Sequence, residues 1–136
     1  MVERVFEARV ENLDSVLEFM EDELLSHGCI MKLVMPINIS LEEMFVNIAS
    51  YAYEPGTGDA TISIDFEGDD VVVQLRDTGM EFDPLAKIDP DINASAEERG
   101  IGGLGIYMVK KYMDKCEYER KDGTNIFTMR KNIKNA

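Results

Sequence analysis

The chain has 136 residues, of which 45% are hydrophobic and 30% are charged, and its formal net charge is −13. This composition is typical of a single globular domain, residues 1–136, with a buried core. The acidic charge argues against binding to nucleic acid or to an anionic membrane, since both require a basic surface. No apolar run is long enough to span a membrane, and the N-terminal segment is too acidic for a signal peptide, so we expect a cytoplasmic protein.

Two cysteines and one histidine are too few for a disulfide framework or a zinc cluster of the usual spacing. We expect Cys29 and Cys116 to be reduced and partly buried, and His27 to be a surface residue. Because the chain is so acidic, any bound phosphate would have to be held by backbone amides, a helix dipole and a divalent cation.

The first half of the chain predicts one strand and two helices. Residues 4–10 alternate as in a strand, and apolar residues then recur at helical spacing between a cap at Asn12 and a stop at Gly28. A second helix is predicted to begin at Ser40, because a glutamate stands three residues later at the spacing of a capping box. This helix covers about 40–53.

The second half contains two predicted hairpins with a helix between them. Residues 61–67 and 71–76 alternate on either side of a Gly-Asp-Asp turn, and 117–121 and 125–130 flank an Asp-Gly turn. An amphipathic pattern predicts the helix, over about 104–115. Strands paired mostly through hairpins, with helices that must cover one face, predict an α/β (α+β) two-layer sandwich with a mixed, mostly antiparallel sheet.

The second helix carries a polar stripe. Glu43, Asn47, Ser50 and Glu54 are spaced i, i+4, i+7 and i+11, so a continuous helix would place them on one face. An ordinary solvated face would also explain them, but this face carries no lysine or arginine. Carboxylate and amide oxygens suit a magnesium ion that keeps several waters and substrate phosphates, and a nearby glutamate can act as a general base.

A glycine-rich run, Arg99–Ile106, precedes the third predicted helix and follows a polar stretch. Four glycines stand within six residues of it: Gly100, Gly102, Gly103 and Gly105. Such a loop brings backbone N–H groups close to an anion, and a nucleotide phosphate is the obvious one. Dinucleotide-binding folds and protein kinases share the G-x-G-x-x-G pattern, but the chain lacks the further strands and motifs that those sites need, and it has no P-loop.

Two shorter motifs each allow two interpretations. Asp77-x-Gly79 follows a buried strand, where it is either a turn or a carboxylate that accepts a hydrogen bond from the exocyclic amine of a base, with Gly79 allowing close approach. Gly123-Thr124 is either a hairpin tip or a hydroxyl group that reaches the same base edge.

In this order, the motifs resemble the nucleotide site of the GHKL ATPase superfamily, and in particular its stand-alone branch, the bacterial anti-sigma-factor serine kinases. The resemblance covers about residues 4–131 and implies a Bergerat-type ATP-binding fold. Leu41–Tyr53 is similar to the N-box, Asp77–Pro84 to the first glycine box, residues 83–99 to the mobile lid, Arg99–Ile106 to the second glycine box and Gly123-Thr124 to the final threonine motif.

The resemblance implies that Glu43 is the catalytic carboxylate, that Asn47 binds Mg²⁺, and that Asp77 binds adenine. Its motifs also imply a set of nucleotide-binding residues, namely Asn47, Ser50, Asp77, Gly79, Glu81, Arg99, Gly100, Ile101, Gly102, Gly103, Leu104, Gly105 and Thr124. The chain departs from the pattern at Ser50, where many relatives have histidine, and at Glu81, where the wider superfamily often has glycine.

The resemblance further implies a protein-serine kinase that uses ATP and Mg²⁺, phosphorylates a small antagonist protein and binds a sigma factor. The family is commonly dimeric, and the apolar N-terminal strand and first helix are compatible with a homodimer. The alternative is a non-catalytic switch, in which the bound nucleotide gates the binding of a partner. Glu43 favours the kinase, because a pure binding module needs no general base. An interaction domain without a nucleotide would leave the glycine loop unexplained.

Overall fold

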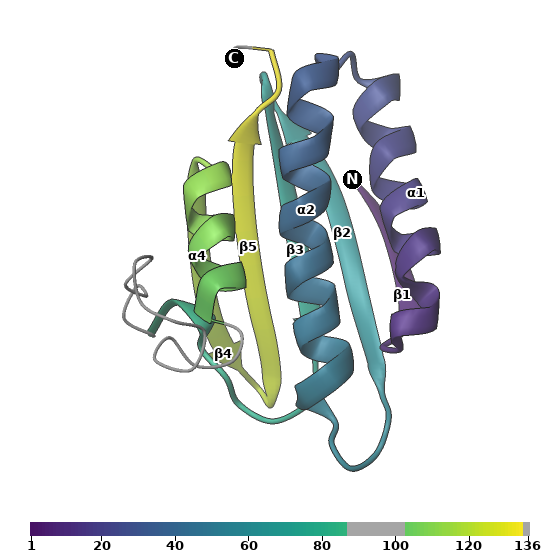
Figure 1. Ribbon diagram of the computed structural model, residues 1–136, viewed down its shortest axis with the longest axis vertical. Helices are drawn as coiled ribbons and strands as arrows, with labels where there is room; N and C mark the ends of the chain where they lie inside the picture. The colour runs from purple at the N-terminus through teal and green to yellow at the C-terminus, as the bar shows by residue number, and fades with distance from the viewer. Residues whose placement is uncertain (87–102, 135–136) are drawn as a thin grey trace.

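A computed structural model describes residues 1–86 and 103–134 (Figure 1). In these ranges the chain forms a five-stranded sheet in the order β1-β2-β3-β5-β4, and every strand pair is antiparallel. The predicted α+β sandwich is therefore confirmed, with antiparallel pairing throughout these strands. The strands are β1 (Val2–Glu7), β2 (Asp59–Glu67), β3 (Asp70–Asp77), β4 (Lys115–Lys121) and β5 (Thr124–Asn132).

Three α-helices in the described ranges cover one face of the sheet, and Figure 1 shows α2 between α1 and α4. Their bounds are α1 (Leu13–Ser26), α2 (Met31–Asn47) and α4 (Gly103–Tyr112). Shorter turns of helix are η1 (Val10–Asn12), the π-helical η2 (Ile48–Ala52) and η3 (Pro84–Ala86). Within these same residues, no helix is both long and apolar enough to cross a membrane.

The core lies between the helices and the sheet, because alternate strand residues point toward the helices. In β3 the buried residues are Val71, Val73, Leu75 and finally Asp77. β5 continues the same layer with Phe127 and Met129, but the first buried residue of this strand is Asn125. Both apolar rows therefore end in a polar residue at the same end of the sheet.

Both predicted hairpins are confirmed, and their turns explain why. The β2–β3 hairpin closes at the Glu67–Asp70 pair, and Gly68 has a φ of +61°. In the β4–β5 hairpin, Asp122 (φ 52°) and Gly123 (φ 76°) both adopt positive φ. A two-residue type I′ turn requires that conformation, and Asp-Gly is one of the sequences that adopts it most readily.

The predicted start of the second helix at Ser40 is wrong, because α2 begins at Met31. Ser40 is fully buried inside the helix, and its hydroxyl donates to the carbonyl of Pro36 at 2.9 Å instead of capping a helix end. Pro36 removes one backbone donor from the helix. Burial of Leu33 and Ile37 against the core outweighs that loss, so the helix runs through the proline.

The remaining predicted boundaries hold to within a few residues. β1 ends at Glu7, earlier than expected, and the side chain of Asn12 donates to the Glu7 carbonyl at 2.8 Å rather than capping α1. The expected stop at Gly28 is confirmed, since Gly28 has a φ of +75° just beyond α1. Cys29 and Cys116 are both free thiols, as expected. His27 is exposed and stacks on the ring of Phe66.

Candidate functional site

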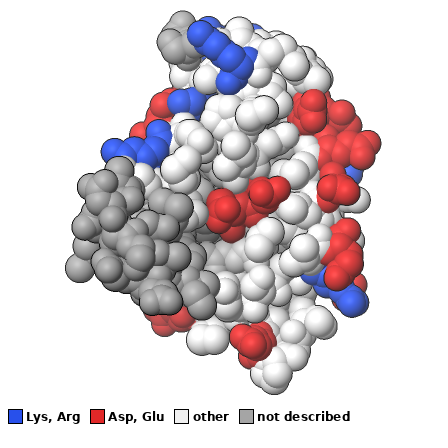
Figure 2. Space-filling view, viewed as in Figure 1, with Lys and Arg blue, Asp and Glu red and all other residues white. Residues whose placement is uncertain are grey.

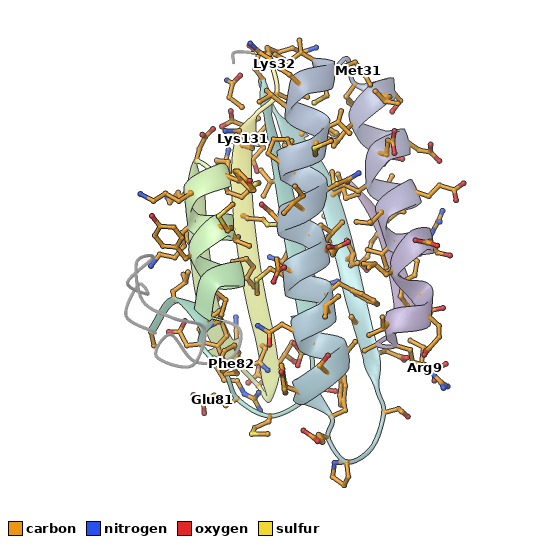
Figure 3. All side chains as sticks on the ribbon, viewed as in Figure 1. Arg9, Met31, Lys32, Glu81, Phe82 and Lys131 are labelled. Carbon is orange, nitrogen blue, oxygen red and sulfur yellow. The ribbon has the colours of Figure 1, made fainter. Side chains whose placement is uncertain are left out.

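A cavity of about 490 Å³ opens at the end of the sheet where β3 ends and β5 begins. Its walls come from the C-terminal half of α2, from η2, from the segment after β3, from α4 and from the β4–β5 hairpin. Figure 3 shows Glu81 and Phe82 on the segment after β3, at the same end of the molecule as the last turn of α2. A cavity of this size is typical of small-molecule sites.

Several of the predicted site residues line this one cavity: Glu43, Asn47, Ser50, Asp77 and Glu81. They come from α2, η2 and the end of β3, which are far apart in the sequence. Glu54, the last residue of the predicted polar stripe, is exposed and does not line the cavity. The reason is that the helical conformation ends with η2 at Ala52, so Glu54 follows in a turn and is no longer part of a helical face.

The carboxylate of Glu43 lies directly against the backbone of Gly105, in the first turn of α4. A Cβ atom at position 105 would lie 2.0 Å from Glu43 Oε2, so only glycine leaves room for the carboxylate. Burial, and then the charge of the neighbouring Glu42, raise the pKa of Glu43 above its ordinary value. A carboxylate of this kind is better suited to accept a proton than a fully solvated one.

Gly79 is required by packing inside the protein. A Cβ atom there would lie 2.3 Å from the carbonyl oxygen of Ala52 in η2. The next residue, Met80, donates its backbone N–H to the same oxygen at 2.8 Å. The Gly79 N–H itself donates to Asp77 Oδ1 at 3.0 Å. Close approach at Gly79 was predicted, and the structure shows that the approaching group is the backbone of η2.

Asn125 lies beside Asp77, where the sequence predicted Thr124. Asn125 is paired directly with Asp77 across β3 and β5, and its Nδ2 donates to Asp77 Oδ1 at 3.0 Å. Its Oδ1 accepts a hydrogen bond of 2.5 Å from the hydroxyl of Tyr118. Thr124 does not line the cavity, because side chains alternate along β5 and the odd-numbered positions face the helices.

Asn125 and Tyr118 were both missed, although the sequence held a signal for Asn125. It is in phase with Phe127 and Met129 on the buried side of β5, and a polar residue in a buried row needs a hydrogen-bond partner. Four predicted nucleotide-binding residues lie outside the described residues: Arg99, Gly100, Ile101 and Gly102. So does the predicted lid from residue 87 onward. Gly103 and Leu104 form the start of α4.

A match to a protein-family model shows to which family the chain belongs. The model of the histidine kinase-like ATPase domain family matches residues 6–131. The chain belongs to this family. The predicted resemblance is thereby confirmed, and the match includes every residue that lines the cavity.

Two curated proteins named as protein kinases are similar to this chain. It is 26% identical over 99 residues to the serine/threonine-protein kinase BtrW of Bordetella bronchiseptica, a match that covers 72% of this chain and 70% of that protein. It is 30% identical over 102 residues to the serine-protein kinase RsbW of Staphylococcus aureus, covering 71% of this chain and 64% of the relative. These matches span about two thirds of the relatives' length.

Two solved structures share the fold. A structure of the RsbU and RsbW domains of a Mycobacterium tuberculosis protein superposes with a TM-score of 0.66 at 14% identity, covering 98% of this chain and 33% of that one. The Acinetobacter baumannii histidine kinase AdeS superposes with a TM-score of 0.51 at 15% identity, covering 99% and 69% of the two chains. At such identities the likeness shows the fold alone.

The chemistry of the cavity fits the ATP that a histidine kinase-like ATPase uses. Its apolar wall includes Ile48, Leu75 and Phe127, which can contact a base, and Asp77 supplies a buried hydrogen-bond acceptor at the edge of that wall. Asn47 supplies the kind of oxygen that magnesium accepts. Among the described residues, no group of three His, Cys, Asp or Glu side chains could hold a metal ion. Magnesium bound in enzyme sites commonly keeps several waters and takes phosphate oxygens of the substrate as further ligands.

Proposed function

We propose that this chain is a protein-serine kinase of the anti-sigma-factor type, which transfers the γ-phosphate of ATP to a serine of a small antagonist protein. The observation that carries the proposal is that Glu43, a carboxylate with a raised pKa, lines the same cavity as Asn47 and Asp77. Relatives named as serine-protein kinases also support it.

In this proposal, Asp77 and Asn47 bind the two ends of ATP. Asp77 accepts a hydrogen bond from the exocyclic amine of adenine, while the apolar wall of the cavity contacts the ring. Asn47 holds Mg²⁺, which when bound supplies positive charge beside the phosphates. Backbone N–H groups at the start of α4 face the same anion, since the N-terminus of a helix favours negative charge.

Glu43 acts as the general base in the transfer step. The serine hydroxyl gives its proton to a carboxylate oxygen of Glu43 while its oxygen forms a bond to the γ-phosphorus. The bond between that phosphorus and the β–γ bridging oxygen breaks, and ADP leaves. Phosphoryl transfer depends mainly on positioning and electrostatics, so a compact site without a strong nucleophile suffices.

The partners are part of the same proposal: a small antagonist protein, a sigma factor, and a second copy of the chain. Figure 2 shows acidic groups gathered along α1, and a net charge of −13 favours partner surfaces that are basic. The support for the homodimer is β1, which is an edge strand of the sheet that the described residues form and which exposes Val2 and Val5. ATP and these partners occur in the cytoplasm, where we place the reaction.

The test is to incubate the chain with γ-labelled ATP and with candidate small proteins encoded beside it. Label on a serine of one of these proteins supports the kinase. If ATP binds and gates the binding of a partner but no label is transferred, the chain is the non-catalytic switch instead. If ATP does not bind, both functions are excluded.

A further inference from the structure

Asn125 joins the proposed adenine acceptor to the wall of the cavity. Asp77 and Asn125 are opposite each other in β3 and β5, and each residue is only 6% exposed. Asn125 Nδ2 donates to Asp77 Oδ1 at 3.0 Å and to the carbonyl oxygen of Met80 at 2.8 Å. Its Oδ1 accepts hydrogen bonds from the Tyr118 hydroxyl at 2.5 Å and from the Phe82 N–H at 3.5 Å.

The partners of Asn125 fix the orientation of its amide. A carboxylate and a backbone carbonyl can only accept, so the NH₂ group must face Asp77 and Met80. Oδ1 then faces Tyr118, whose hydroxyl must donate. Burial, and then the nearby Glu81 carboxylate, raise the pKa of Tyr118, which keeps the phenol protonated and able to donate. Both protons and the oxygen of the amide are thus engaged within the protein.

The same contacts leave one oxygen of Asp77 for a ligand. Oδ1 already accepts from the Gly79 N–H and from Asn125 Nδ2, both at 3.0 Å. Oδ2 accepts no hydrogen bond from the described residues. Asp77 lines the cavity. Because its Oδ1 is engaged by Gly79 and Asn125, Oδ2 is the carboxylate oxygen that we assign to a ligand.

We propose that Asn125, held by Tyr118, is a positioning residue that makes this site select adenine over guanine nucleotides. The inference rests on the proposed function, since it requires a nucleotide site at Asp77. The fixed, acceptor-only Oδ2 matches the amine of adenine, whereas guanine would place its O6 acceptor against it. Neither the Asn125 amide nor the Tyr118 hydroxyl has a free donor with which to bind O6.

This role differs from a purely structural one in what it predicts for two nucleotides. If Asn125 only stabilised the fold, its removal would weaken ATP and GTP binding by the same factor. If it holds the Asp77 carboxylate in one orientation, its removal weakens ATP binding and also relieves the repulsion toward GTP. The ratio of the two affinities then falls.

The experiment is calorimetric titration of ATP and of GTP, each with Mg²⁺, into the native chain and three variants. Tyr118→Phe removes the donor that orients the amide, and Asn125→Ala removes the amide itself. Tyr107→Phe is the matched control, because it also removes a phenol hydroxyl but lies outside the cavity. We expect the ATP-to-GTP affinity ratio to fall about threefold in Tyr118→Phe, to fall roughly tenfold or more in Asn125→Ala, and to stay unchanged in the control.

The outcomes separate the inference from the function on which it rests. An unchanged affinity ratio in a folded Tyr118→Phe or Asn125→Ala chain, checked by thermal unfolding, would overturn the positioning role while ATP binding still stands. A loss of affinity by the same factor for ATP and GTP also leaves the ratio unchanged, and it would overturn the positioning role in the same way. Failure of the native chain to bind ATP would instead overturn the proposed function. If Asn125→Ala does not fold, Tyr118→Phe decides the matter, because it keeps the shape of the ring.

Discussion

The backbone of Gly105 in α4 and the carboxylate of Glu43 in α2 are in direct contact, since a Cβ atom at position 105 would lie 2.0 Å from Glu43 Oε2. Glycine is a poor helix former, so its presence inside the first turn of α4 needs a reason. The contact supplies this reason. Glycine makes helix formation less favourable than alanine by about 1 kcal/mol, but it leaves room for the Glu43 carboxylate.

Gly105→Ala is predicted to displace that carboxylate without unfolding the chain. Because a misplacement of about 1 Å at a reacting group can cost roughly 100-fold in rate, we expect a loss of that order in transfer of labelled γ-phosphate. The matched control is Gly56→Ala, where the nearest atom to the new Cβ would be the Tyr53 carbonyl at 3.4 Å. If Gly105→Ala transfers the labelled γ-phosphate at the native rate, the position of Glu43 has no effect on the reaction.

Gly79→Ala is predicted to destabilise the fold. The new Cβ would lie 2.3 Å from the carbonyl oxygen of Ala52 and would push apart η2 and the turn after β3, which are joined by the Met80–Ala52 hydrogen bond. Overpacking of this kind costs about 1–3 kcal/mol. Denaturant unfolding measures that loss, and a midpoint equal to that of the native chain would show that the two segments separate freely.

Glu43→Gln is predicted to be more stable than the native chain at about pH 7 but not at about pH 4. The pKa of Glu43 is raised by burial and by Glu42, so the folded chain keeps a proton that the unfolded chain releases. Stability therefore falls as the pH rises from the ordinary carboxyl range through the raised pKa. Melting temperatures at the two pH values test this, and a difference that does not depend on pH would contradict it.

Asn47→Ala is predicted to remove the part of the ATP affinity that depends on magnesium. Asn47 lines the cavity and supplies an oxygen that suits this ion. Calorimetric titration of ATP with and without Mg²⁺ measures the effect, and Asn38→Ala is the control because Asn38 is also in α2 but does not line the cavity. Equal magnesium dependence in Asn47→Ala and the native chain would remove Asn47 from the site.

The hairpins and the cluster of Glu43, Asn47 and Asp77 could be predicted because they depend on short sequence patterns. The turn at Asp122-Gly123 requires positive φ at two residues, and few sequences provide it. The start of α2 could not be found in the same way. Ser40 has the pattern of a helix cap, and only the burial of the preceding turns extends the helix back to Met31.

Asn125 shows what a local pattern cannot supply. Its contact with Asp77 joins residues that are 48 positions apart, and it depends on the register between β3 and β5. A shift by one residue would bring Thr124 to that place, because side chains alternate along a strand. The sequence pointed to the correct end of the hairpin, and the strand register determines which side chain faces the cavity.

The most direct test of the kinase assignment is to separate ATP binding from phosphoryl transfer in Glu43→Ala. Calorimetry measures ATP affinity, and the same preparation is tested for transfer of labelled γ-phosphate to the small protein that the native chain is proposed to phosphorylate. We predict near-native ATP affinity with transfer reduced by roughly 100-fold or more, since in the proposed reaction Glu43 takes the serine proton. Full transfer by Glu43→Ala would contradict its role as the general base.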